Sequence, residues 1–104
     1  MSADLSVYKK DFPIFSRSVR GGNPLIYLDS GATSQKPEVV IQAEAGFYRT
    51  KNAAVHRGAH LLAEEASDAY EGARKNVARF IGAASSEVIF TKSATESLNF
   101  LATS

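Results

Sequence analysis

A short apolar run followed by a capped helix, residues 87–99, constrains the fold of this chain more than any other segment. Residues 88–90 (Val-Ile-Phe) favour β structure and have polar neighbours, which predicts a buried strand. Ser93 stands three residues before Glu96, the spacing of a capping box, so we expect a helix to begin near Ala94. A strand, a loop and a helix in this order are typical of an α/β protein.

The start of this expected helix is suited to binding an anion. The first N–H groups of a helix have no partner within it, and they carry the positive end of the helix dipole. The hydroxyls of Ser93 and Thr95 add donors at the same end. We therefore predict a phosphate site here, with a capped helix that binds no ligand as the alternative.

The rest of the chain alternates short predicted elements. In chain order they are a helix over 4–11, a turn at 21–24, a strand over 25–28, a helix over 37–48, a helix over 63–81 closed by Gly82, and a strand over 88–91. In the longest helix, an apolar stripe lies opposite Glu71, Arg74 and Lys75, which predicts a solvated face for these three.

Composition excludes several classes of protein. The net charge is +1 and the basic residues are interspersed with acidic ones, so we expect neither a nucleic-acid partner nor a membrane surface. No apolar run reaches the roughly 18 residues of a membrane span, and no signal peptide begins the chain, so we expect a cytoplasmic protein. The absence of cysteine excludes a cysteine nucleophile and thiolate metal sites within these residues.

Both histidines lie in one irregular stretch, residues 52–60. His56 and His60 have the spacing of two zinc ligands on a helix. We predict no metal there, because Gly58 weakens a helix and no glutamate follows His56 as in a metalloprotease motif. A surface loop with locally paired histidines is the alternative to a functional loop.

Three stretches, in this order and spacing, resemble the N-terminal part of the Suf-type (group II) cysteine desulfurases and selenocysteine lyases, in the class-V aminotransferase family of pyridoxal-phosphate enzymes. They are Tyr-Leu-Asp-Ser-Gly-Ala-Thr-Ser-Gln-Lys-Pro at 27–37, Asn-Ala-Ala-Val-His-Arg-Gly-Ala-His at 52–60, and Val-Ile-Phe-Thr-Lys-Ser-Ala-Thr-Glu-Ser-Leu-Asn at 88–99. The resemblance implies an α/β fold, the N-terminal part of a fold-type I transferase with a three-layer αβα large domain. Residues 1–24 would be an arm with a short helix, and 25–104 the incomplete first part of the cofactor-binding domain.

The resemblance also implies a role for the start of the last helix. Ala94 and Thr95 match the pair that holds the phosphate of pyridoxal 5′-phosphate, through a backbone N–H and a threonine hydroxyl. Many relatives have threonine where this chain has Ala94. Because any residue except proline supplies the N–H, this difference should weaken only side-chain contributions.

Four further residues are expected near the substrate by resemblance. Gly31 and Ala32 match a small pair beside the substrate end of the cofactor. His56 and Arg57 match residues that line the entrance of the active site, with Arg57 near the site of the partner subunit in a homodimer. Arg57 would bind a substrate carboxylate or form a structural pair at the interface. His60 is expected to be structural.

The implied reaction is the conversion of L-cysteine, or L-selenocysteine, to L-alanine, with a persulfide passed to an acceptor protein for iron–sulfur cluster assembly. The family uses a cysteine nucleophile and a cofactor-binding lysine preceded by histidine, and this chain contains neither. We therefore expect no catalytic residue in this chain and an inactive N-terminal fragment. A non-catalytic protein-binding remnant of the fold is the alternative, and a kynureninase-like or isopenicillin-epimerase-like relative is a further one.

Overall fold

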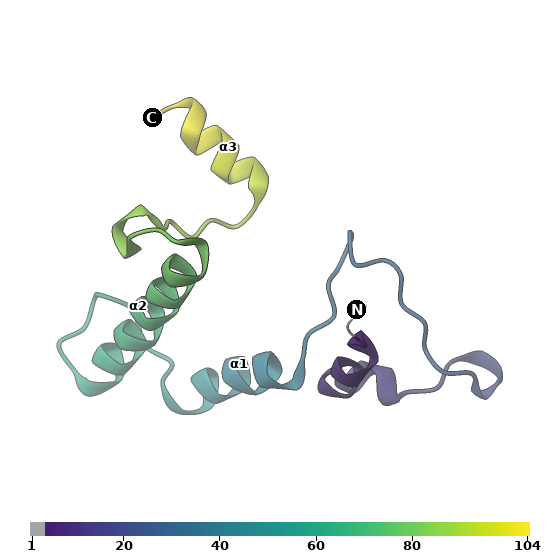
Figure 1. Ribbon diagram of the computed structural model, residues 1–104. Helices are drawn as coiled ribbons and strands as arrows, with labels where there is room; N and C mark the ends of the chain where they lie inside the picture. The colour runs from purple at the N-terminus through teal and green to yellow at the C-terminus, as the bar shows by residue number, and fades with distance from the viewer. Residues whose placement is uncertain (1–3) are drawn as a thin grey trace. The chain divides into compact units, whose positions relative to one another are not determined.

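The computed structural model describes residues 4–104 and consists of helices joined by loops (Figure 1). The α-helices are α1 (Glu38–Thr50), α2 (Leu61–Ile81) and α3 (Ala94–Ala102), and the 3₁₀ helices are η1 (Leu5–Asp11), η2 (Pro13–Ser16), η3 (Arg20–Gly22) and η4 (Ser85–Glu87). The chain forms two compact units, residues 1–52 and 53–104. None of the described helices is long and apolar enough to span a bilayer.

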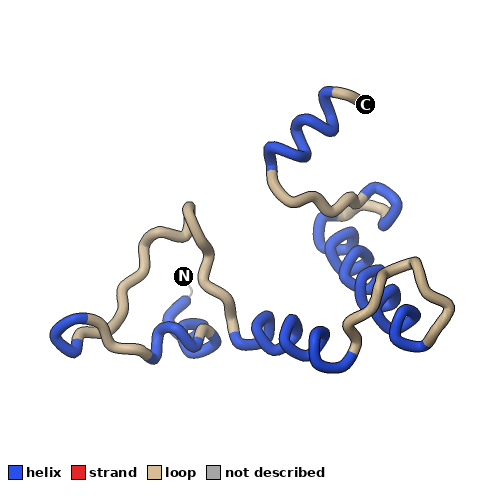
Figure 2. The backbone as a smooth tube through the Cα atoms, turned by 180° about the vertical axis from the view of Figure 1, so that it is seen from behind, coloured by secondary structure: helices blue, strands red, loops and turns tan. Residues whose placement is uncertain are grey.

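The two strands predicted over 25–28 and 88–91 are absent from the described part of the chain, where Figure 2 shows only helices and loops. The β layer of the predicted α/β fold is therefore not seen in residues 4–104, which form helices and loops. Both segments are apolar in sequence, but a strand forms only where a neighbouring strand accepts and donates its backbone hydrogen bonds. Without such a neighbour, Ile26 and Leu28 are 76% and 92% exposed.

The first unit begins with the short helix that the sequence predicted, although it is a 3₁₀ helix. A side-chain oxygen of Asp4 accepts from the N–H of Ser6 (3.0 Å) and so caps η1. Phe12 ends η1 in an extended conformation, as expected for a residue that precedes proline. The predicted turn is also present, since Gly21 and Gly22 both have a φ of 75°.

Helix α1 closes the first unit and begins one residue later than predicted. Pro37 is its N-cap and not its first helical residue, with an extended ψ of 154°. The carbonyl of Pro37 still accepts from the N–H groups of Val40 and Ile41, at 3.0 and 3.2 Å. A difference of one residue is within the usual uncertainty of a helix boundary.

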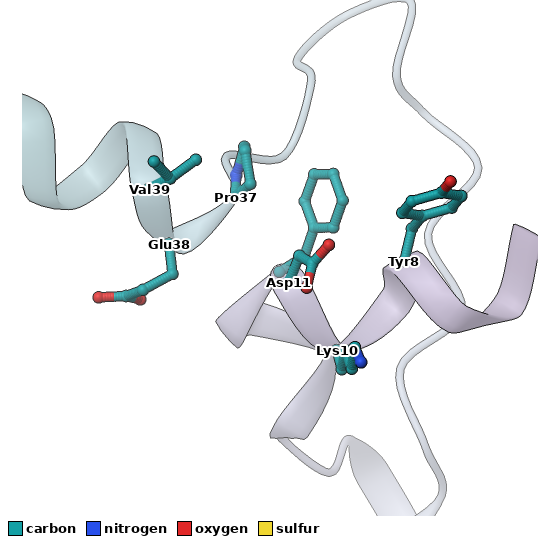
Figure 3. A pocket seen from close by; sticks show the side chains of 7 residues that line it. Tyr8, Lys10, Asp11, Pro37, Glu38 and Val39 are labelled. Carbon is teal, nitrogen blue, oxygen red and sulfur yellow. The ribbon is translucent and has the colours of Figure 1, made fainter.

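A hollow of about 710 Å³ in the first unit lies between η1 and the start of α1. Figure 3 shows its lining, which consists of Tyr8, Lys10, Asp11, Phe12, Pro37, Glu38 and Val39. None of the six predicted site residues is among them.

Helix α2 dominates the second unit and has a well-defined cap at each end. It begins at Leu61, where Nδ1 of His60 accepts from the N–H of Ala63 at 3.4 Å. It ends at Gly82, which has a left-handed conformation with φ 73° and donates to the carbonyls of Ala78 and Arg79. The predicted glycine stop is confirmed.

Of the three residues predicted on the solvated face of α2, Lys75 is exposed, whereas Glu71 and Arg74 are partly buried. Arg74 is only 21% exposed, and its Nη1 donates to the carbonyl oxygen of Val88, a residue of the buried core. The guanidinium lies 5.1 Å from the ring centre of Tyr70 and 5.4 Å from that of Phe90. Its Nε donates to Glu71 Oε2 at 3.0 Å. Arg74 thus attaches the segment around Val88 to α2.

Glu71 is the acidic member of this cluster. Its carboxylate accepts from Arg74, and its second oxygen, Oε1, lies 3.0 Å from Nε2 of His56. The hydrogen bond from Arg74, followed by that from His56, holds the pKa of Glu71 below its ordinary value. The ionised form is therefore favoured by folding.

A matched pair of glycine substitutions tests the helix assignment. Gly82→Ala should lower the free energy of unfolding by about 1–2 kcal/mol, because a left-handed conformation costs an L-residue that amount. Gly72→Ala, inside α2, should raise it by about 0.5–1 kcal/mol. Beyond the adjoining backbone, nothing lies within 4 Å of the added methyl group at either position, so the conformational effect dominates. Urea unfolding followed by far-ultraviolet circular dichroism measures both, and equal signs would contradict the assignment.

The pKa of Glu71 predicts a pH dependence. Because the pKa is lower in the folded state, its contribution is complete above the unfolded value and is lost as the pH falls through the folded value. Glu71→Gln should therefore destabilise the chain near neutral pH, and this effect should shrink as the pH falls below the ordinary pKa of a glutamate. Urea unfolding of both proteins at neutral pH and below that pKa measures this difference. The control is Asp68→Asn, which removes an exposed carboxylate from the middle of α2, away from the helix end.

Candidate functional site

The helix α3 begins where the sequence predicted, at Ala94 with Ser93 as its N-cap. Ser93 Oγ accepts from the N–H of Glu96 at 3.2 Å. The carboxylate of Glu96 accepts from the N–H of Lys92 at 2.5 Å, one residue before the partner that a standard capping box would use. Two backbone donors at this end are thus occupied by side chains.

The donors that remain at this end fit a phosphate. Among residues 4–104, no acceptor binds the N–H groups of Ala94 and Thr95 or the hydroxyl of Thr95. Two backbone N–H groups and one hydroxyl therefore lie together at the positive end of the helix dipole. Oxyanions bind well to such donors, because each phosphate oxygen accepts several hydrogen bonds. The Glu96 carboxylate reduces the positive potential there, while it stabilises the helix.

A pair of hydroxyl groups fixes the segment that leads into α3. Thr91 Oγ1 lies 2.6 Å from Ser97 Oγ and donates to the carbonyl of Ser93 at 3.3 Å. Ser97 Oγ also lies 3.2 Å from this carbonyl oxygen. The sequence analysis did not identify Thr91 or Ser97, since serine and threonine residues at this spacing have no specific signature.

The predicted entrance loop is held by α2. His56 has a φ of 59°, a left-handed conformation that is uncommon outside glycine. Its N–H donates to Ser67 Oγ at 2.9 Å, and its ring packs edge-on against Tyr70 with centres 6.1 Å apart. The ring also lies 3.0 Å from Glu71, so Tyr70 and Glu71 orient the imidazole, while Ser67 holds the backbone. Since an ionised carboxylate only accepts hydrogen bonds, Nε2 of His56 carries the proton in this contact.

The remaining residues of this loop have separate roles. A Cβ atom on Gly58 would lie 2.7 Å from the Cβ of Ala63, so this position requires glycine. His60 caps α2, as the structural role predicted for it implies. Arg57 is exposed, and no residue of the described range 4–104 forms a hydrogen bond or ion pair with its guanidinium. Arg57 is thus available to an external carboxylate.

The predicted small pair lies in a tight turn of the first unit. The carbonyl of Asp29 accepts from the N–H groups of Ala32 and Thr33, both at 3.1 Å. Tyr27 Oη lies 3.0 Å from the same carbonyl and 2.5 Å from that of Thr33, so the phenol closes the turn. Open space surrounds the missing side chain of Gly31. Tyr27 was not identified by the sequence analysis as a residue that supports this turn.

The second unit contains four of the predicted site residues, Ala94, Thr95, His56 and Arg57, whereas Gly31 and Ala32 belong to the first. The polar contacts of α2 connect the loop of His56 to the segment that precedes α3. The roles of all six residues toward a cofactor or substrate stay predictions.

The curated proteins most similar to this chain include several that are named cysteine desulfurases. The chain is 62% identical over 98 residues to a protein described as "Probable cysteine desulfurase 2" from Mycobacterium leprae, with 94% of this chain and 23% of the relative covered. It is 57% identical over 100 residues to a "Probable cysteine desulfurase" from Streptomyces coelicolor (95% and 24% covered). It is 50% identical over 105 residues to a "Cysteine desulfurase" from Yersinia pseudotuberculosis (100% and 26% covered). The chain therefore spans about a quarter of the length of these curated relatives.

A solved structure and a family model agree with these relatives. The apo structure of a cysteine desulfurase from Thermococcus onnurineus NA1 matches 98% of this chain and 24% of that chain, with a TM-score of 0.81 and 39% identity. The chain thus has the fold of one part of a larger known enzyme. The model of the aminotransferase class-V family matches residues 26–104, well over half of the chain. On this match, the chain belongs to the class-V aminotransferase family.

Proposed function

We propose that this chain is part of a Suf-type, pyridoxal-phosphate-dependent cysteine desulfurase. The observation that carries the proposal is the group of unpaired donors at Ala94 and Thr95, within a class-V aminotransferase segment. The names of the relatives support a desulfurase over the alternative of a non-catalytic binding protein.

The residues of this chain would bind and orient the cofactor and the substrate. Pyridoxal phosphate, when bound, supplies the electron sink for cleavage of the carbon–sulfur bond. The N–H groups of Ala94 and Thr95 and the Thr95 hydroxyl would hold its phosphate. By resemblance to the family, Gly31 and Ala32 would lie at the substrate end, and Gly31 has open space where a side chain would be.

The proposed substrate is L-cysteine or L-selenocysteine, whose carboxylate suits the free guanidinium of Arg57. In a homodimer the same guanidinium would alternatively pair with a carboxylate at the subunit interface. The sulfur-accepting cysteine and the lysine that binds the cofactor are not among these 104 residues, since the chain has no cysteine and no His-Lys pair. The persulfide product would pass to an acceptor protein for iron–sulfur cluster assembly.

Thr95→Val tests the phosphate site in an enzyme that contains this segment together with the lysine and the cysteine. The change keeps the backbone N–H and removes one donor to a charged acceptor, which contributes roughly 1.5–3 kcal/mol. Affinity for pyridoxal phosphate should fall roughly 10- to 150-fold, and excess cofactor should restore activity. Thr103→Val makes the same change beyond the opposite end of α3 and should leave affinity unchanged. Equal affinities of the two variants in dialysis titrations would show that Thr95 does not hold the phosphate.

The 104-residue chain should be inactive by itself. With pyridoxal phosphate, it should develop no stoichiometric visible absorbance band of a lysine-bound cofactor, because none of its lysines follows histidine. It should release neither alanine nor sulfide from L-cysteine, because it has no cysteine nucleophile. Absorbance titration and alanine assays measure these outcomes. A bound-cofactor band that disappears on substitution of one lysine would contradict the expectation.

A further inference from the structure

A continuous series of polar contacts crosses one face of α2. Nε2 of His56 lies 3.0 Å from Oε1 of Glu71, and Oε2 of Glu71 accepts from Nε of Arg74, also at 3.0 Å. The other end of the Arg74 guanidinium donates to the carbonyl of Val88. The series therefore begins in the loop of His56 and ends in the segment that leads to α3.

The chemistry of the two α2 side chains explains why they can connect two separate segments. A carboxylate has two acceptor oxygens, and Glu71 uses one for each neighbour. A guanidinium has a planar fork of donors, and Arg74 uses one end for Glu71 and the other for Val88. A lysine at position 74 has a single ammonium group and lacks this fork.

We propose that Glu71 and Arg74 are positioning residues of the candidate site, which hold the loop of His56 and Arg57 and the segment before α3 on one face of α2. This inference rests on the proposed function, because that function gives the two segments their roles. An isolated surface ion pair between residues three apart on a helix would contribute little. Here, however, the partners His56 and Val88 lie 15 and 14 residues from Glu71 and Arg74, respectively.

The first test uses the 104-residue chain itself, without cofactor, and asks whether a change at one end of the series of contacts alters the other end. Nuclear magnetic resonance would follow the ring signals of His56 and the amide of Ile89, which shares its peptide group with the Val88 carbonyl. Arg74→Lys should shift the His56 ring signals, although Arg74 does not touch that ring, and Glu71→Gln should shift the Ile89 amide. A purely local role would confine each effect to direct contacts. Control variants are Glu64→Gln and Lys75→Arg, both at exposed positions of α2.

Two results of this first test would overturn the proposal. One is that Arg74→Lys leaves the His56 ring unchanged while the Ile89 amide shifts. The other is that the His56 amide of the unaltered chain exchanges at the random-coil rate, since its bond to Ser67 should slow exchange.

The second test uses the enzyme that contains this segment. Arg74→Lys should raise the KM for L-cysteine roughly 2- to 30-fold, the range expected for coupling of about 0.5–2 kcal/mol through a packed network. The affinity for pyridoxal phosphate should change less than it does in Thr95→Val. An unchanged KM would overturn the positioning role. Failure of the proposed function would appear separately, as cofactor affinity that is insensitive to Thr95→Val.

Discussion

The organisation of the second unit depends on the guanidinium of Arg74 more than on an apolar core. The buried apolar residues of the described chain are Ala63, Ala66, Ala78 and Val88, and no large side chain among residues 4–104 is completely buried. Burying alanine removes little apolar surface from water. These contacts therefore allow segments to approach closely, but they do little to fix the position of one segment on another. Arg74 fixes this position, because its guanidinium donates to the carbonyl of Val88. The rings of Tyr70 and Phe90 pack against the guanidinium and hold it in place.

Ile26, Leu28, Ile89 and Phe90 are exposed, although Val88 is buried, and the nature of strands explains this exposure. Residues 25–28 and 88–91 have the composition of buried strands, yet they have no strand neighbour in the described chain. Pairing and burial are properties of at least two segments, whereas a helix satisfies its own backbone.

Local features were therefore predictable from the sequence, and non-local ones were not. Ser93 and Gly82 were identified as helix caps, because capping depends on residues within one turn. Glu71 and Arg74 were assigned to a solvated face from their charge, since helical periodicity cannot show what packs against a polar face. The donors at the start of α3 and a phosphate as their ligand followed from the capped helix, but pyridoxal 5′-phosphate was suggested only by resemblance to a family.

The loop around His56 shows how a short motif can present one side chain. The backbone and ring of His56 are bound to Ser67 and Glu71, Gly58 permits the close approach of α2, and His60 caps that helix. Each of these three residues therefore has a structural contact within the chain. Arg57 alone in the motif has an exposed charged group without a protein partner in the described chain. Because its neighbours on both sides are fixed, its backbone position is restricted while its guanidinium stays available, which is the arrangement that lowers the entropic cost of binding a carboxylate.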